Sequence, residues 1–228
     1  ENVYFVDRKV ETHEEANIKA ICQNSLQGRI CQFNKIKTYS QENENLESRI
    51  VDKFRFNTID RLVHFACLGH SLIASAYCNI TNSYALDAYY SLGFDECLLS
   101  SELDYSSMKL LIDDYFSRHS IYPNVGINIY GRYDVMIMKS CPIGTYFHNK
   151  SIHCQRCHQE QYYLKDRLQE KFPLVGEDNC TVRVLDYKIL YLIDKILELN
   201  KINIKNFYLN FTLENEQEVQ SIIDNSLV

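Results

Sequence analysis

The 228-residue sequence lacks the long apolar runs and sorting signals that would place it in or across a membrane. No stretch approaches the roughly 18 consecutive apolar residues that a membrane-spanning helix needs. The first twenty residues carry charges throughout, unlike the apolar core of a signal peptide. Trp is absent, and only three Pro and seven Gly occur. We therefore expect a cytoplasmic protein with no membrane contact.

Several motifs that mark common enzyme classes are also missing. No Gly-x-Gly-x-x-Gly follows a predicted strand, so the sequence lacks the fingerprint of a dinucleotide-binding fold. The segment His13-Glu14-Glu15 does not continue to the second histidine of a zinc-protease motif. The net charge of -6 excludes a global basic footprint, but a local basic patch could still bind nucleic acid.

What the sequence does contain, from about Phe54 onward, is a regular alternation of apolar strands and amphipathic helices. Strands and helices that alternate at short spacing indicate a parallel sheet built from β/α units. We predict strands at 72–78, 96–99, 125–130, 135–139, 181–185 and 206–211, and helices at 59–68, 84–92, 105–118, 187–199 and 214–227.

The predicted fold class is α/β, with TIM-barrel-like parallel β/α units. A complete barrel has eight units in about 250 residues, so this chain would form a partial or degenerate barrel. We predict a poorly defined segment over 1–53, with a short strand at 3–6 and a helix at 11–24, and one β/α domain over 54–228. Because the chain begins at Glu1 and not at Met, we expect a processed or excised piece. Because fewer than eight units are predicted, we expect a partner subunit or a missing N-terminal half to complete the barrel.

The chemistry of the sequence is concentrated in a cysteine-rich loop at 141–180. Of the nine cysteines, those in apolar runs are predicted to be reduced and buried: Cys22, Cys67, Cys78 and Cys97. Four others surround the end of the apolar run 135–138, which we predict to be a buried parallel strand. We name these the cysteine quartet: Cys141, Cys154, Cys157 and Cys180.

Several interpretations of the cysteine quartet are open from the residues alone. Four thiolates can hold a structural zinc ion or an iron–sulfur cluster. The alternative is a pair of free thiols at Cys154 and Cys157 plus two buried cysteines. His153 and His158 flank the pair, and either could replace a cysteine as a ligand, although both are typical of exposed loop residues.

A second group of candidates lies at the ends of predicted strands, where parallel α/β folds place their functional residues. Asn79 and Asn82 would line a substrate pocket, and Glu102 and Arg132 would act in catalysis. Each has a structural alternative. Asn82 or Ser83 can cap the next helix, Glu102 can lie in a first helical turn, and Arg132 can pair with a carboxylate.

The order of these motifs resembles peptidase family U32, the collagenase-like group. The segments that carry the resemblance are 77–104, 130–144 and 154–186. They contain an Asn-x-x-Asn strand end, a Ser-x-Glu-Leu strand end, Gly-Arg before a Met-rich strand and Cys-Pro, paired cysteines, and a Leu-x-Asp-Arg element. The resemblance runs from about residue 60 to the C-terminus.

This resemblance implies a TIM-barrel-like domain and a 4Fe-4S cluster on the cysteine quartet. Members of the family with assigned roles include oxygen-independent hydroxylation systems for ribosomal RNA, transfer RNA or ubiquinone precursors, and others carry a protease or collagenase label. Our leading hypothesis is an iron–sulfur protein of the hydroxylation type with RNA as its substrate. The second is a peptidase, and the third is a non-catalytic module in which the quartet holds a structural zinc.

Overall fold

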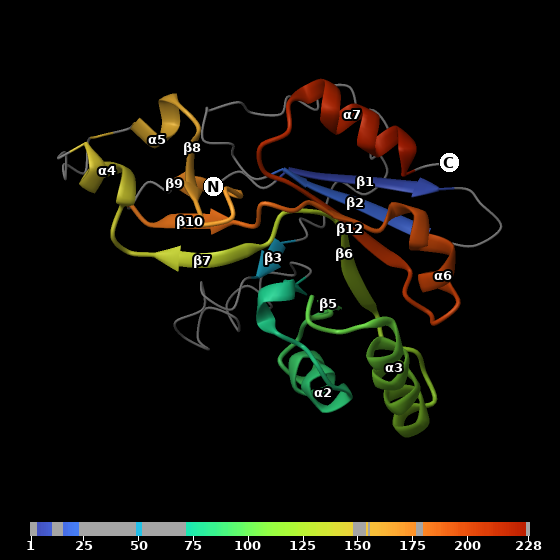
Figure 1. Ribbon diagram of the computed structural model, residues 1–228. Coiled ribbons are helices and arrows are strands. Elements are labelled where there is room, and N and C mark those ends of the chain that lie inside the picture. The colour runs from blue at the N-terminus through green and yellow to red at the C-terminus, as the bar shows by residue number, and fades with distance from the viewer. Residues whose placement is uncertain are drawn as a thin grey trace.

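The structure is a computed structural model that describes residues 4–10, 16–22, 49–51, 72–147, 154, 156–176 and 180–226. For the first three ranges only the backbone is described. The described elements form a large sheet of eight strands and a small sheet of four strands (Figure 1). The predicted helix at 59–68 lies outside the described residues.

The large sheet has a continuous parallel centre. Its strand order is β1-β2-β12-β6-β5-β4-β3, and β11 pairs with β6 beside this path. All neighbours from β2 to β3 are parallel, whereas β1 and β11 are antiparallel to their partners. The strands are β1 (Tyr4–Val10), β2 (Ala16–Cys22), β3 (Arg49–Val51), β4 (Leu72–Ala74), β5 (Glu96–Leu98), β6 (Val125–Gly131), β11 (Leu190–Tyr191) and β12 (Asn206–Phe211).

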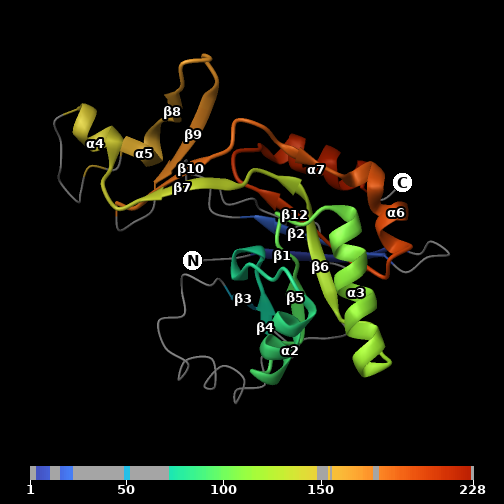
Figure 2. The same cartoon turned by 60° about the horizontal axis from the view of Figure 1, so that its bottom comes forward.

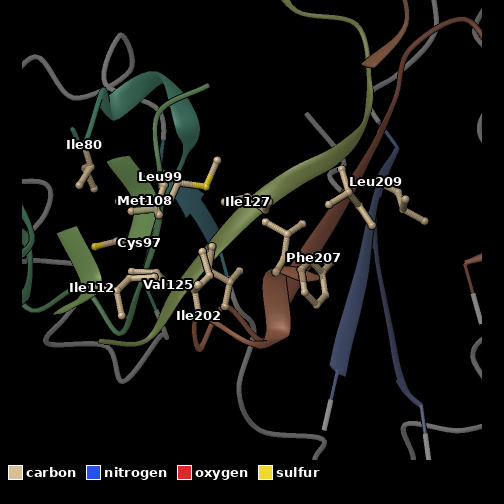
Figure 3. Close-up of a cluster of buried hydrophobic side chains, with 14 of the residues drawn as sticks. Ile80, Cys97, Leu99, Met108, Ile112, Val125, Ile127, Ile202, Phe207 and Leu209 are labelled. Atoms are coloured by element: carbon tan, nitrogen blue, oxygen red, sulfur yellow. The ribbon is translucent and has the colours of Figure 1, made fainter. Parts of the chain in front are cut away.

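One face of this sheet is packed against helices. The helices are α2 (Ser83–Ser91), α3 (Tyr105–His119), α6 (Ile196–Asn200) and α7 (Glu216–Asn225), with short 3-10 turns η2 (Ala76–Cys78) and η3 (Ile193–Lys195). Their apolar stripes and the strand residues that face them form one core, part of which is drawn in Figure 3. Ile127 and Phe207 lie at its centre, 4% and 0% exposed.

The opposite face of the large sheet holds a buried polar contact. The hydroxyl of Tyr208 on β12 donates a 2.7 Å hydrogen bond to Glu96 Oε1 on β5. Gly126 lies between them, where a Cβ atom would come within 2.9 Å of both side chains. A glycine is needed there because the tyrosine ring crosses directly over the β6 backbone.

The small sheet extends from the ends of β6 and β12 (Figure 2). It is antiparallel, in the order β7-β10-β9-β8, and it carries two short helices. Its elements are β7 (Asp134–Met138), α4 (Pro142–Tyr146), α5 (Arg156–Gln159), β8 (Tyr162–Lys165), β9 (Lys171–Gly176) and β10 (Val182–Leu185). Both figures show α4 and α5 away from the helices of the large sheet.

The structure corrects the prediction for the apolar run 135–138. This run forms β7, but β7 is an antiparallel edge strand of the small sheet, not a buried parallel strand. Val135, Met136 and Ile137 are 51%, 53% and 47% exposed. An apolar run alone does not tell whether helices will cover a strand on both faces, and here they do not.

The α/β class and the parallel β/α units are confirmed, but the TIM-barrel fold is not. Within the described residues the large sheet is open, and antiparallel strands accompany the parallel ones. The helix predicted at 11–24 is wrong, because Ala16–Cys22 is a strand parallel to β12. The helix predicted at 187–199 is also wrong, because this segment forms β11, η3 and the start of α6. None of the described helices is long and apolar enough to cross a bilayer.

Candidate functional site

Polar residues gather where the parallel strands of the large sheet end. Ser100 follows β5, and its hydroxyl donates a 2.8 Å hydrogen bond to Asn79 Oδ1, just beyond β4 and η2. Asn79 has a left-handed backbone, with φ of 55°, and its side chain is exposed. The carboxyl edge of β4 and β5 therefore presents Asn79, one of the two predicted pocket residues.

Asn82 and Glu102, two further predicted site residues at the ends of β4 and β5, differ in their contacts. Asn82 is the N-cap of α2, and its side chain accepts a 2.9 Å hydrogen bond from the Ala85 amide. Glu102 is exposed and precedes α3, whose N-cap is Asp104. The capping role considered for Asn82 is confirmed, whereas the first-turn position considered for Glu102 is wrong.

Arg132 is hydrogen-bonded to the backbone that follows the small sheet. Its Nη1 atom donates hydrogen bonds of 2.7 Å and 2.6 Å to the carbonyl oxygens of Asp186 and Tyr187, just after β10. A guanidinium bound to two carbonyls is fixed in orientation and stays charged. Arg132 therefore ties the end of β6 to the end of β10, and its positive charge lies at the carboxyl edge.

A buried network that the sequence analysis missed lies next to Arg132. Asp134, at the start of β7, accepts a 2.8 Å hydrogen bond from the hydroxyl of Tyr77 and pairs with Arg183 of β10 at 3.3 Å. The Asp134 and Arg183 side chains are 5% and 13% exposed. Burial, and then the Asp134 charge, raise the pKa of Tyr77 well above its usual value. In the sequence, only Arg183, a charged residue between two apolar valines, indicated that a buried charged contact is present here.

Two further contacts close this edge. Tyr133 bonds to the side chains of Ser101 and Asn128, and burial raises the pKa of Tyr133 to about 12. Glu214 accepts hydrogen bonds from the Thr212 amide at 2.7 Å and from the Tyr130 hydroxyl at 3.1 Å. Both tyrosines are therefore neutral hydrogen-bonding groups at physiological pH.

Two buried polar atoms near the end of β12 have no hydrogen-bond partner within the part of the chain that the structure describes. They are Asn210 Oδ1 and Thr212 Oγ1, on residues 9% and 5% exposed. Buried polar groups are normally paired with protein, water or ligand. Asn210 lies opposite Gly131 at the end of β6, so these atoms leave hydrogen-bonding capacity for a polar ligand group at the carboxyl edge.

The cysteine quartet belongs to the small sheet. Cys141 follows β7 and caps α4, where its sulfur accepts a 3.2 Å hydrogen bond from the Gly144 amide. Cys154 and Cys157 lie before and within α5, and Cys180 leads into β10. All four are half-buried, reduced thiols. The turn of helix α4 begins at Cys141 because Pro142 fits the first helical position, which has no amide to satisfy.

The other three thiols of the quartet lie near Cys157. Burial raises the pKa of Cys157, and the neighbouring sulfurs of Cys141, Cys154 and Cys180 raise it further. These electrostatic contributions require all three to lie near Cys157. The structure thus brings together four cysteines that span 40 positions of the sequence.

A single zinc ion and an iron–sulfur cluster require different spacings of the four sulfurs. Among the residues described, no three His, Cys, Asp or Glu side chains are arranged to hold one metal ion. A tetrahedral zinc at about 2.3 Å from each sulfur would draw the sulfurs to within about 4 Å of one another. A cluster with one thiolate on each iron needs more widely spaced sulfurs.

A small apolar core connects the quartet with the large sheet. Cys157 packs against Val175 and Leu185, and so does Leu213, the second residue after β12. The thiols and the carboxyl edge of the parallel strands are therefore parts of one region.

The sequence as a whole matches the model of one protein family, described as peptidase family U32, over residues 11–225. The chain belongs to peptidase family U32. The match begins about fifty residues before the point at which the recognisable motifs start. No curated protein and no solved structure matches the chain.

The described histidines give a U32 peptidase no nucleophile–base pair. His119 Nε2 lies 2.7 Å from Asp87 Oδ1 on the outer helices. Within the described residues, neither His119 nor His158 is hydrogen-bonded to a serine or a cysteine. The family name alone therefore does not assign hydrolysis to this chain.

Proposed function

We propose that the cysteine quartet binds one 4Fe-4S cluster and that the chain is an iron–sulfur protein of the oxygen-independent hydroxylation type, with RNA as its substrate. The observation that carries the proposal is the convergence of four reduced, half-buried thiols around Cys157. The choice of a cluster over a single zinc ion rests on the resemblance in the motif order, and four thiolates are the usual ligands of a 4Fe-4S cluster.

The surroundings of the quartet fit a cluster. When bound, a cluster of this kind supplies one-electron transfer, with a potential set by burial and by hydrogen bonds to sulfur. The Gly144 amide already donates a hydrogen bond to the Cys141 sulfur. Ile143, Leu174 and Val182 form an apolar core against which Cys141 and Cys157 pack, and this core limits access of water to the sulfurs.

The substrate would bind at the carboxyl edge of the parallel strands. Asn79 and Glu102 present exposed polar side chains there, and Arg132 supplies a fixed positive charge. Asn82 would hold the start of α2 in place through its cap. Hydroxylation and the choice of RNA rest on the resemblance in the motif order, supported by a local excess of basic residues around the quartet.

The experiment that tests the proposal compares two cysteine substitutions in protein purified without oxygen. Cys157→Ser removes a ligand at the centre of the quartet, and we expect it to abolish most of the bound iron and acid-labile sulfide. Cys78→Ser is the matched control, because Cys78 is a buried, reduced cysteine in the core of the large sheet. The control is expected to keep its iron.

The readout is iron and sulfide per chain, together with the visible absorption spectrum. Equal iron in both variants would contradict the assignment of the quartet. One zinc per chain in the unsubstituted protein, with no iron, would support the structural-zinc alternative instead.

A further inference from the structure

An exposed group of aromatic residues and one arginine lies beside the cysteine quartet. We name it the aromatic–arginine cluster: Tyr146, Phe147, Arg156 and Tyr162. The Phe147 ring lies 5.0 Å from the Tyr146 ring and 5.9 Å from the Tyr162 ring, between centroids. The Arg156 guanidinium lies over Phe147, 4.4 Å from its centroid. Tyr146 and Phe147 remain 78% and 38% exposed.

A second arginine lies over an exposed aromatic ring elsewhere in the chain, and the two arginines differ in the carboxylates around them. On α2 and α3, the Arg118 guanidinium lies 4.3 Å from the centroid of the exposed Tyr84 ring. That guanidinium is neutralised by Asp87, at 2.8 Å. Arg156, by contrast, forms no direct ion pair with a carboxylate among the described residues. It bonds to Tyr162, whose hydroxyl also donates a 2.9 Å hydrogen bond to Glu160 Oε2, so the nearest carboxylate contacts Arg156 only through the tyrosine.

The part of the chain around the quartet also differs in charge from the rest. Residues 132–188 contain nine Lys and Arg against seven Asp and Glu, whereas the remainder contains fifteen against twenty-three. An acidic chain thus carries a locally basic region, and it coincides with the small sheet and its exposed aromatics. This combination favours a polyanion with flat apolar groups over a peptide or a lipid surface.

We propose that the aromatic–arginine cluster is a stacking platform for unpaired bases of single-stranded RNA, an inference that rests on the proposed function. Proteins recognise single strands by stacking splayed bases on aromatic and arginine planes, with basic residues along the phosphates. Arg156 and Cys157 are adjacent in the chain, so a base stacked on Phe147 lies beside the quartet. The platform would hold the RNA while one of its nucleotides binds at the carboxyl edge of the parallel β-strands.

The test measures binding of a fluorescein-labelled single-stranded RNA dodecamer of mixed sequence to anaerobically purified full-length chain, by fluorescence anisotropy. We expect Phe147→Ala to weaken binding about 10-fold, since base stacking on an aromatic ring contributes about 1–3 kcal/mol. Tyr146→Ala should also weaken binding. Because Tyr146 is highly exposed, this substitution should leave the stability of the fold unchanged. Arg156→Gln should lower the salt slope of log affinity by about 0.7, the value for one lost contact to a single-strand phosphate.

Tyr84→Ala is the matched control, because Tyr84 is an exposed tyrosine under an arginine on the outer helices. It should leave RNA affinity unchanged. Iron is measured in every sample, so that a loss of RNA binding caused by loss of the iron–sulfur cluster can be told from a loss caused by the substituted side chain. Equal losses in Phe147→Ala and Tyr84→Ala, with full iron, would overturn the platform and leave the proposed function standing. Iron-loaded, unsubstituted protein that binds no RNA would overturn both the platform and the RNA part of the proposed function.

Discussion

The two sheets use similar apolar residues in opposite ways. Ile127 on β6 and Ile137 on β7 are both isoleucines inside apolar strands, separated by ten positions, yet they are 4% and 47% exposed. Helices cover Ile127, whereas Ile137 lies on an edge strand of the small sheet. The large sheet is a packed scaffold, whereas the small sheet buries β9 and β10, exposes its edge strand β7 and carries the thiols.

The difference between the sheets makes the connection between them important. Asp134 stands at the start of β7. It accepts a hydrogen bond from Tyr77 of η2, which follows β4 of the large sheet, and pairs with Arg183 of β10. Arg132 makes a second connection through the carbonyl oxygens after β10. The small sheet, whose edge strand β7 is half exposed, is thus fixed to the scaffold by buried polar contacts.

The largest expected effect comes from breaking this connection. Asp134→Ala would remove the carboxylate that pairs with Arg183 and accepts the Tyr77 hydrogen bond, and breaking a buried ion pair costs about 3–5 kcal/mol of the free energy of unfolding. Urea unfolding followed by circular dichroism would measure it. The matched control is Asp113→Ala, which removes an exposed carboxylate paired with Lys109 on α3, where little change in stability is expected because solvent screens the pair. Equal losses of unfolding free energy in the two variants would contradict the claim that the Asp134 contacts stabilise the junction between the sheets.

A smaller and sharper test uses the two isoleucines themselves. Ile127→Ala should cost about 2–5 kcal/mol, because it opens a cavity in the core of the large sheet. Ile137→Ala should cost less than about 1 kcal/mol, because its side chain is half exposed and loses mainly strand preference. The same urea unfolding measures both. A large loss for Ile137→Ala would show that β7 is covered in solution and would remove the contrast between the sheets.

Local patterns allowed much of the large sheet to be predicted. The segment from α2 to β6 follows the sequence closely, since caps such as Asn82 and a terminator such as Gly93 mark its helix ends. The strand at 16–22 was missed because Ala16, Ile18 and Ala20 alternate with period two within a stretch that also fits a helix. Pairing with β12 decides between them, and that contact is invisible to local sequence.

The candidate site was predictable only where a motif marked it. The Cys-x-x-Cys pair and its two flanking cysteines pointed to the quartet, and the structure places Cys141, Cys154 and Cys180 near Cys157. The contacts of Asp134 could not be predicted, because Tyr77 and Arg183 lie 57 and 49 positions away from it. The ligand of the quartet stays a prediction.

Metal and sulfide analysis of the unsubstituted chain, purified under nitrogen, tests the central claim most directly. We expect about four iron and four acid-labile sulfide per chain, as in a 4Fe-4S cluster on four thiolates, and a brown solution. Colourless protein with one zinc and no sulfide would contradict the account.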